Sequence, residues 1–220
     1  MVGYQHVQDS AVTTVTAPTA TGTVAITPTA GNLLVVFVSG GITTNSGNVS
    51  DDVEGTQNWM RLASISGLAQ REVAIWIKLE APNGLTTITV TSIGFDTYEF
   101  AASEFSGLGK SQRLYVGDQV SDVTSQTTHQ GSALGMTFTT STIFVVAGRI
   151  NSVQTECNPG TGYTEVPSGY TNGQHLYQWK IAPGAINAEV GAWSNTGSPA
   201  PSVTAMVAIR GGSLQNVCRA

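Results

Sequence analysis

Apolar and polar residues alternate along most of this chain, and the alternation constrains the fold more than any other feature. Within residues 71–79, the apolar odd-numbered residues from 73 onward share one face, whereas Trp76 and Lys78 lie on the other. A two-residue period is typical of a half-buried β-strand. Leu33–Val38 is apolar at every position, which predicts a central strand covered on both faces. No segment has convincing helical spacing, so we expect an all-β protein.

The composition supports this class and excludes several others. The 220 residues include 29 threonines, 20 serines and 25 glycines; threonine favours strands and glycine favours turns. Charged residues make up 10% of the chain, against roughly 25% in an ordinary soluble domain. Three lysines are too few for a helical bundle, and a net charge of −5 argues against nucleic-acid binding through phosphate neutralisation. A hydrophobic content of 40% argues against disorder.

The second half of the chain resembles the first. Leu33–Val36 aligns with Ile143–Val146, 110 positions later, and Phe100–Gly107 aligns with Thr204–Gly211, 104 positions later. Three further pairs align in the same order: Asn58–Leu62 with Gly162–Val166, Val73–Leu79 with His175–Ile181, and Ala81–Pro82 with Ala182–Pro183. Because the offset drifts only in loops, we expect two diverged half-repeats, about 1–109 and 110–220.

Two architectures are compatible with two half-repeats. Each half could form a separate small sandwich, or both halves could contribute strands to one sandwich of two sheets. The join at Ser106–Lys110 is short and contains no linker rich in proline and charge, which favours the second. Jelly rolls combine strands from both chain halves in both sheets. We therefore predict one domain over residues 1–220, a single double-sheet, jelly-roll-like β-sandwich, with residues 1–30 as an N-terminal strand or arm.

Six segments follow one another in an order that carries a resemblance. They are Ala30–Val38, Val49–Asp52, Asn58–Leu62, Val73–Lys78, Thr86–Thr91 and Glu104–Gly107. This order resembles a diffuse group of jelly-roll proteins found in bacteriophage virions and in bacterial surface or secreted proteins. That group has a GNLLVV-like strand, a Ser-Asp plus Asn-Trp turn, a Trp/Tyr-rich strand, a Thr-rich strand and a Glu-[Tyr/Phe]-Ser-Gly strand. The turn between Asp51 and Trp59 is longer here than in the group.

The resemblance covers nearly the whole chain and implies a structural or binding role. It implies a bacteriophage capsid decoration (cement) protein that binds the outer surface of the shell, or a tail or fibre part. The expected partners are the major capsid protein or other virion proteins, with homo-oligomers on the particle. Residues 1–6 lack the basic and apolar regions of a signal peptide, and no apolar run approaches the roughly 18 residues of a membrane helix. We therefore expect a protein made in the host cytoplasm and located in the virion, with no membrane or nucleic-acid partner.

Residues suited to catalysis are sparse. The histidines are His6, His129 and His175. We expect His175 to pack within a strand rather than to activate a nucleophile. Glu99 and Glu104 are five positions apart, which places them on opposite faces of an unbulged strand, and Glu72 and Glu80 lie too far apart to act as a glycosidase pair. The sequence therefore predicts no enzyme, no catalytic residue and no cofactor.

One loop gathers three acidic residues, Asp51, Asp52 and Glu54. Calcium favours several oxygens from one loop, but this spacing does not fit the EF-hand. We expect a solvated acidic turn and no metal site, with calcium binding left open.

The two cysteines, Cys157 and Cys218, are too few for a disulfide scaffold. They could pair only if the C-terminus folds back. We expect two free thiols.

Tryptophans support an alternative function, the binding of carbohydrate. They are Trp59, Trp76, Trp179 and Trp193. Trp76 is the best candidate for an exposed stacking platform, because it lies opposite the apolar face of its strand, and its polar repeat partner Gln178 supports an outward position. Tyr163 and Tyr170 could add loop contacts. The competing interpretation, which we favour, is that Trp76 packs under the other sheet or a loop. The alternative function is a carbohydrate-binding module or a tail or fibre component that recognises a host-surface glycan.

Overall fold

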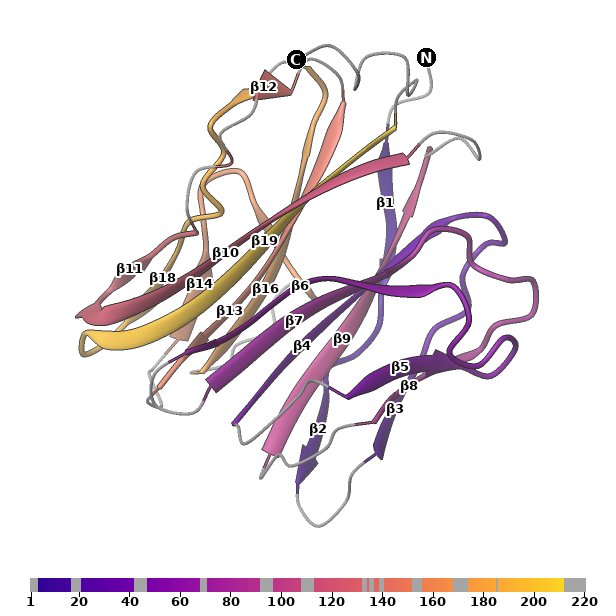
Figure 1. Ribbon diagram of the computed structural model, residues 1–220, viewed down its shortest axis with the longest axis horizontal. Coiled ribbons are helices and arrows are strands. Elements are labelled where there is room, and N and C mark those ends of the chain that lie inside the picture. Colours follow the sequence, from indigo (N-terminus) through magenta and orange to yellow (C-terminus); the bar gives the residue numbers. More distant parts are fainter. Residues whose placement is uncertain are drawn as a thin grey trace.

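The structure is a computed structural model, and it is all-β with antiparallel sheets (Figure 1). It describes residues 4–16, 21–41, 47–67, 71–91, 97–107, 113–131, 134, 137–138, 141–151, 156–167, 174–184 and 186–211. The first half contains β1 (Gln5–Asp9), β2 (Thr13–Thr16), β3 (Thr21–Ala25), β4 (Leu33–Gly41), β5 (Asn48–Asp51), β6 (Trp59–Gly67), β7 (Arg71–Lys78), β8 (Thr87–Thr91) and β9 (Thr97–Ser106). The second half contains β10 (Arg113–Gln126), β11 (Thr128–His129), β12 (Thr137–Phe138), β13 (Thr142–Ile150), β14 (Glu156–Pro159), β15 (Thr164–Glu165), β16 (His175–Ala182), β17 (Ile186–Asn187), β18 (Trp193–Thr196) and β19 (Ala200–Gly211).

Each half builds its own sheets. The first large sheet has the order β1-β9-β4-β7-β6, with β2 also paired to β9, and the first small sheet is β3-β8-β5. The second large sheet is β10-β19-β13-β16-β15, the second small sheet is β11-β18-β14, and β12 pairs with β17. Within the described ranges, no ladder joins a strand of one half to a strand of the other.

The chain therefore forms antiparallel sheets in two halves, which confirms the all-β class, and in the described residues no sheet mixes strands of both halves as the predicted jelly roll would. Strands close in sequence pair more readily because the connections that must close are shorter. Strands of the N-terminal segment belong to these sheets, since β1 and β2 pair with β9 and β3 pairs with β8. No helix in the part of the chain that the structure describes is long and apolar enough to cross a membrane.

The strand orders of the two halves correspond, as the half-repeats predict. In the large sheets, β9-β4-β7-β6 matches β19-β13-β16-β15, and in the small sheets β8-β5 matches β18-β14. The local backbone corresponds as well, because Asn58 and Gly162 align 104 positions apart and both are left-handed, with φ of 63° and 78°. Asparagine and glycine are the residues that adopt this conformation most readily. Asn58 immediately precedes the edge strand β6, and Gly162 lies two positions before the edge strand β15.

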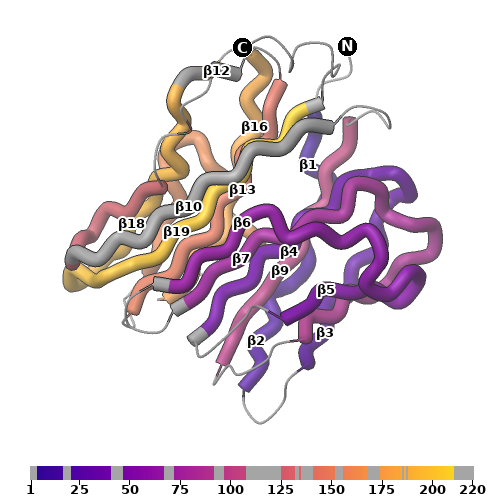
Figure 2. Tube along the Cα trace, in the orientation of Figure 1, coloured from indigo at the N-terminus to yellow at the C-terminus, as the bar shows by residue number. Residues whose placement is uncertain are grey.

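The two large sheets face each other across one shared core (Figure 1). Phe37 of β4 stacks on Tyr177 of β16 with ring centroids 5.4 Å apart, and Val35 and Val145 lie in the same cluster. Strand β6 lies against β19 of the other half (Figure 2), and it contacts β10 as well. The small sheets lie outside the large ones, so the layers run small, large, large, small.

Strand β4 shows why Leu33–Val38 is apolar throughout. Val35 and Phe37 face the shared core, whereas Leu34 and Val36 face a second cluster beneath the first small sheet. All are fully buried. The prediction of a central strand covered on both faces is confirmed, and the same arrangement recurs in β13.

Candidate functional site

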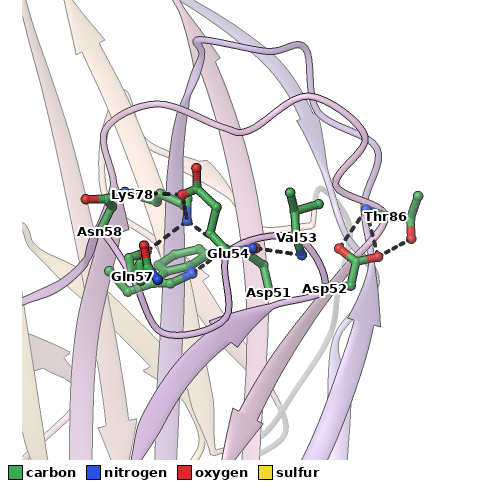
Figure 3. Close-up of polar contacts among 9 residues, drawn as sticks. Asp51, Asp52, Val53, Glu54, Gln57, Asn58, Lys78 and Thr86 are labelled. Carbon is green, nitrogen blue, oxygen red and sulfur yellow. Dashed lines mark hydrogen bonds and ion pairs between the residues drawn. The ribbon is translucent and has the colours of Figure 1, made fainter.

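A dense polar cluster surrounds Lys78 (Figure 3). Lys78 ends β7 and lies opposite Trp59, the first residue of β6, while Asp51 ends β5 of the first small sheet. The Lys78 ammonium contacts Asp51 Oδ2 at 2.7 Å, Glu54 Oε2 at 2.8 Å and the Gln57 carbonyl oxygen at 2.9 Å. Its Nζ lies 5.6 Å from the centre of the Trp59 ring. Three strand ends thus enclose one ammonium group.

Both oxygens of the Asp51 carboxylate are bound. Oδ1 accepts hydrogen bonds from the backbone N–H groups of Val53, at 3.0 Å, and Glu54, at 2.7 Å. Oδ2 accepts one from Trp59 Nε1 at 2.8 Å as well as the Lys78 ammonium. Burial raises the pKa of Asp51, but the hydrogen bonds from Glu54, Lys78, Trp59 and Val53 outweigh it, so the pKa lies below its usual value. Asp51 is therefore an anion fixed inside the protein.

The acidic loop differs from the solvated turn that the sequence predicts. Asp51 is buried, and Asp52 is exposed but accepts bonds from the Thr86 hydroxyl and backbone N–H. The Thr86 hydroxyl, above all, lowers the pKa of Asp52, and Lys78 lowers that of Glu54. These bonds already engage the oxygens that calcium would require. Among the described residues, no group of three or more His, Cys, Asp or Glu is placed to hold a metal.

Acid should weaken the fold partly through Asp52. Its folded pKa lies below the ordinary 3.8, so its contribution to stability is present above that value and is lost as the pH falls through the folded pKa. We expect Asp52→Asn to lower the free energy of unfolding at neutral pH and to converge with the wild type in acid. Urea titrations across that range measure this difference. A gap that widens in acid would contradict the assignment.

The second half repeats the arrangement of a lysine, an aromatic ring and a carboxylate. Lys180, which aligns with Lys78, contacts Glu189 Oε2 at 2.8 Å and lies 5.4 Å from the centre of the Tyr163 ring. The Tyr163 hydroxyl donates to Glu189 Oε1 at 3.0 Å. Burial, followed by the nearby Glu189 charge, raises the pKa of Tyr163 well above its usual value. The recurrence of lysine 102 positions apart is the sequence signal that could have identified this cluster.

The two described residues named for a possible glycan platform, Trp76 and Tyr163, are buried. Trp76 is 9% exposed and packs in the cluster beneath the first small sheet, with the Arg61 guanidinium 5.7 Å from its ring centre. The interpretation that Trp76 packs under the other sheet is confirmed, and its use as an exposed platform is wrong. Tyr163 is buried as well, while Tyr170 lies outside the described residues.

The structure places His175 in a buried cluster where the halves meet. Its Nδ1 hydrogen-bonds to the Ser39 hydroxyl, and its Nε2 lies 3.7 Å from Glu99 Oε2. The Ser39 oxygen is also 2.7 Å from the Tyr177 hydroxyl, which donates to the Glu99 carbonyl oxygen. The set contains the residue types of a nucleophilic site, but Ser39 is only 1% exposed. The contacts join β4 and β9 of the first half to β16 of the second.

The other sequence candidates have structural surroundings. His6 stacks on Trp179 at 4.6 Å between centroids, and His129 bonds to Asn195 Oδ1 at 2.6 Å. Glu104 is fully buried and accepts bonds from three donors: Gln8 Nε2, Thr29 N and Asn32 Nδ2. Glu99 and Glu104 lie on opposite faces of β9, as predicted, since the first meets the other half and the second meets the 27–32 turn.

Cys157 is a buried free thiol that packs with Leu176 and Trp193, whereas Cys218 lies outside the described residues. Burial, with smaller contributions from Glu165 and Glu156, raises the pKa of the Cys157 thiol to about 12. Only the thiolate reacts with alkylating reagents.

We therefore expect Cys157 to resist iodoacetamide at neutral pH in the native protein. Peptide mapping would show the 150–180 peptide unlabelled before denaturation and labelled afterwards, which is the internal control. Rapid labelling of that peptide in the folded state would contradict this placement.

No family model matches the chain, and no curated protein matches it.

Proposed function

We propose that this protein is a structural virion protein of a bacteriophage, a capsid decoration protein that binds the outside of the shell and stabilises it through non-covalent contacts. One observation carries the proposal: side chains that could perform chemistry on a substrate are engaged in internal bonds. Lys78 and Asp51 bind each other, Glu104 holds a turn, and His175 joins the two halves. Side chains committed to internal contacts suit a protein that acts by presenting surface.

The sheet arrangement supports a jelly-roll-like fold for each half of the chain. Each half has a large and a small antiparallel sheet in which strands distant in sequence are neighbours, as jelly rolls require. We propose that each half is a jelly-roll-like unit and that the shared core makes the pair one domain. The resemblance of the strand motifs to virion jelly-roll proteins points the same way. Fold alone does not specify function, so a binding test is required.

The outer face of the first small sheet is the surface that we assign to the shell. Its inward residues Val24, Ile88 and Val90 are buried. Its outward side chains are uncharged and mostly carry hydroxyl or amide groups: Thr21, Thr23, Ala25, Asn48, Ser50, Thr87, Thr89 and Thr91. Such a face can hydrogen-bond to the major capsid protein without desolvating charges. A specific interface buries more than about 1,000 Å² in total.

Shells that lack the protein provide the test. We expect the purified full chain to bind them and to raise the temperature at which they break. Thr23→Arg and Thr89→Arg should weaken binding, because each places a charge in the contact, whereas Thr196→Arg on the second small sheet is the matched control. An unchanged disruption temperature, together with no bound protein after sedimentation, would refute the proposed function.

A further inference from the structure

We propose that Lys78 and Asp51 become joined by a covalent amide bond between their side chains inside the folded protein. Lys78 Nζ lies 2.7 Å from Asp51 Oδ2, so the carboxyl carbon Cγ is the next atom along that group. Glu54 Oε2 lies 2.8 Å from the same nitrogen. A nucleophile, an electrophile and a proton carrier therefore meet at one point (Figure 3). This inference does not depend on the proposed function.

Burial favours the reaction between these two side chains. Both are 0% exposed, and the Trp59 ring lies beside the ammonium. Water, which would compete as a nucleophile, has no access to the pair. The ends of β5 and β7 hold the groups together, and effective molarities for well-oriented groups reach about 10⁵–10⁸ M. Removal of an ion pair from a buried position also relieves the desolvation that both charges suffer.

The contacts of the Asp51 carboxyl group match the needs of acyl transfer. Oδ1 is held by the Val53 and Glu54 backbone N–H groups at 3.0 and 2.7 Å, within the range of oxyanion-hole donors. This oxygen remains as the amide carbonyl. Oδ2 accepts a hydrogen bond from the Trp59 indole N–H at 2.8 Å. This bond assists Oδ2 as the leaving group.

The step balances without an oxidant, a reductant or a second substrate. The Nζ–Cγ bond forms and the Cγ–Oδ2 bond breaks. Of the three ammonium protons, two leave with Oδ2 as water and one stays on the amide nitrogen. Glu54 carries protons from Nζ to Oδ2; its side chain is 36% exposed, so it also exchanges protons with solvent.

The charged state of the ion pair slows this reaction. Oδ2 must be protonated before it leaves as water, and the hydrogen bonds that hold the pKa values of Asp51 and Glu54 below their usual range oppose protonation of these carboxylates. We therefore expect the bond to accumulate after folding rather than during synthesis.

The second half contains a natural control. Lys180 and Glu189 are also 2.8 Å apart, but the lysine side chain is 23% exposed. In the described part of the chain, the Glu189 oxygens accept hydrogen bonds from the Tyr163 hydroxyl and the Lys180 ammonium. The pair of backbone N–H donors that holds the Asp51 carboxylate has no counterpart among these bonds. We expect no amide bond there.

Peptide mapping of the purified full chain tests the proposal. Trypsin cannot cleave after an acylated lysine, so the bond would yield one branched species that joins peptide 1–61 to peptide 72–110, lighter by one water molecule. Separate peptides 72–78 and 79–110 from folded, aged protein, at the full sequence mass, would overturn the inference.

Variants separate the roles of the three side chains. Lys78→Arg keeps the positive charge but cannot form the amide, so it should release peptide 79–110 and show no loss of water. Glu54→Gln should slow bond formation on the order of a hundredfold if Glu54 carries the proton. Bond formation at the wild-type rate in Glu54→Gln would refute that role.

Discussion

Phe37→Ala should lower the free energy of unfolding by about 3–5 kcal/mol, the usual effect of emptying a phenylalanine site in a core. Phe37 is fully buried in the cluster shared by both large sheets, and its ring stacks on Tyr177 of the other half. The cavity therefore removes contacts within the first half and between the halves. Denaturant titration followed by far-ultraviolet circular dichroism measures the change.

The matched control for Phe37 is Val7→Ala, at a residue that is 45% exposed. Surface truncations of this kind usually stay within about 0.5 kcal/mol of the wild type. A Phe37→Ala loss no larger than the Val7→Ala loss would show that the large sheets do not share a core.

Lys78→Met should destabilise the protein by about 3–5 kcal/mol, because it leaves Asp51 as a buried anion without its cation. The substitution keeps most of the side-chain volume, so the loss reports the charge rather than a cavity. If the amide bond has formed, the variant lacks that bond as well and the loss is larger. Chemical denaturation of the variant and the wild type gives the comparison.

Lys180→Met is the control for Lys78, since it removes the equivalent lysine from the second half. Its ion pair with Glu189 is partly exposed, so we expect a loss of only about 1 kcal/mol. Equal losses for the two variants would mean that burial does not distinguish the two sites.

The local pattern of the chain predicts several of its central strands and its duplication. Alternation in residues 71–79 places Ile75 and Ile77 in the shared core, and the unbroken apolar run in β4 identifies a strand with sheets on both sides. The aligned segments fall on matching strands of the two halves. These features are local, so periodicity and internal alignment detect them.

The assembly of the sheets was not predictable in the same way. Periodicity indicates which side of a strand is apolar but not which sheet covers it. Trp76 illustrates this limit, because its alternation with Ile75 and Ile77 suits an exposed face equally well, and only its packing in the cluster beneath the first small sheet shows it to be buried. Whether strands pair within a half or between the halves depends on the lengths of the loops that each pairing must close. The short join between the halves is compatible with both pairings.

The polar cluster depends on contacts that sequence spacing conceals. Asp51 and Lys78 are separated by 27 positions, and only the approach of the β5, β6 and β7 ends brings them together. The spacing identifies the acidic residues as a loop cluster, but it predicts a solvated turn because their cation lies on another strand. The alignment of Lys78 with Lys180 is the sequence signal for this cluster, since both lysines bind a carboxylate beside an aromatic ring.

The central claim is that the two repeated halves form one body through the core between the large sheets. Scanning calorimetry of the full chain tests it most directly. We predict one transition whose calorimetric and van't Hoff enthalpies agree, with Phe37→Ala lowering the midpoint of the whole transition. Two separable transitions, of which Phe37→Ala shifts only the one that belongs to the first half, would contradict the account.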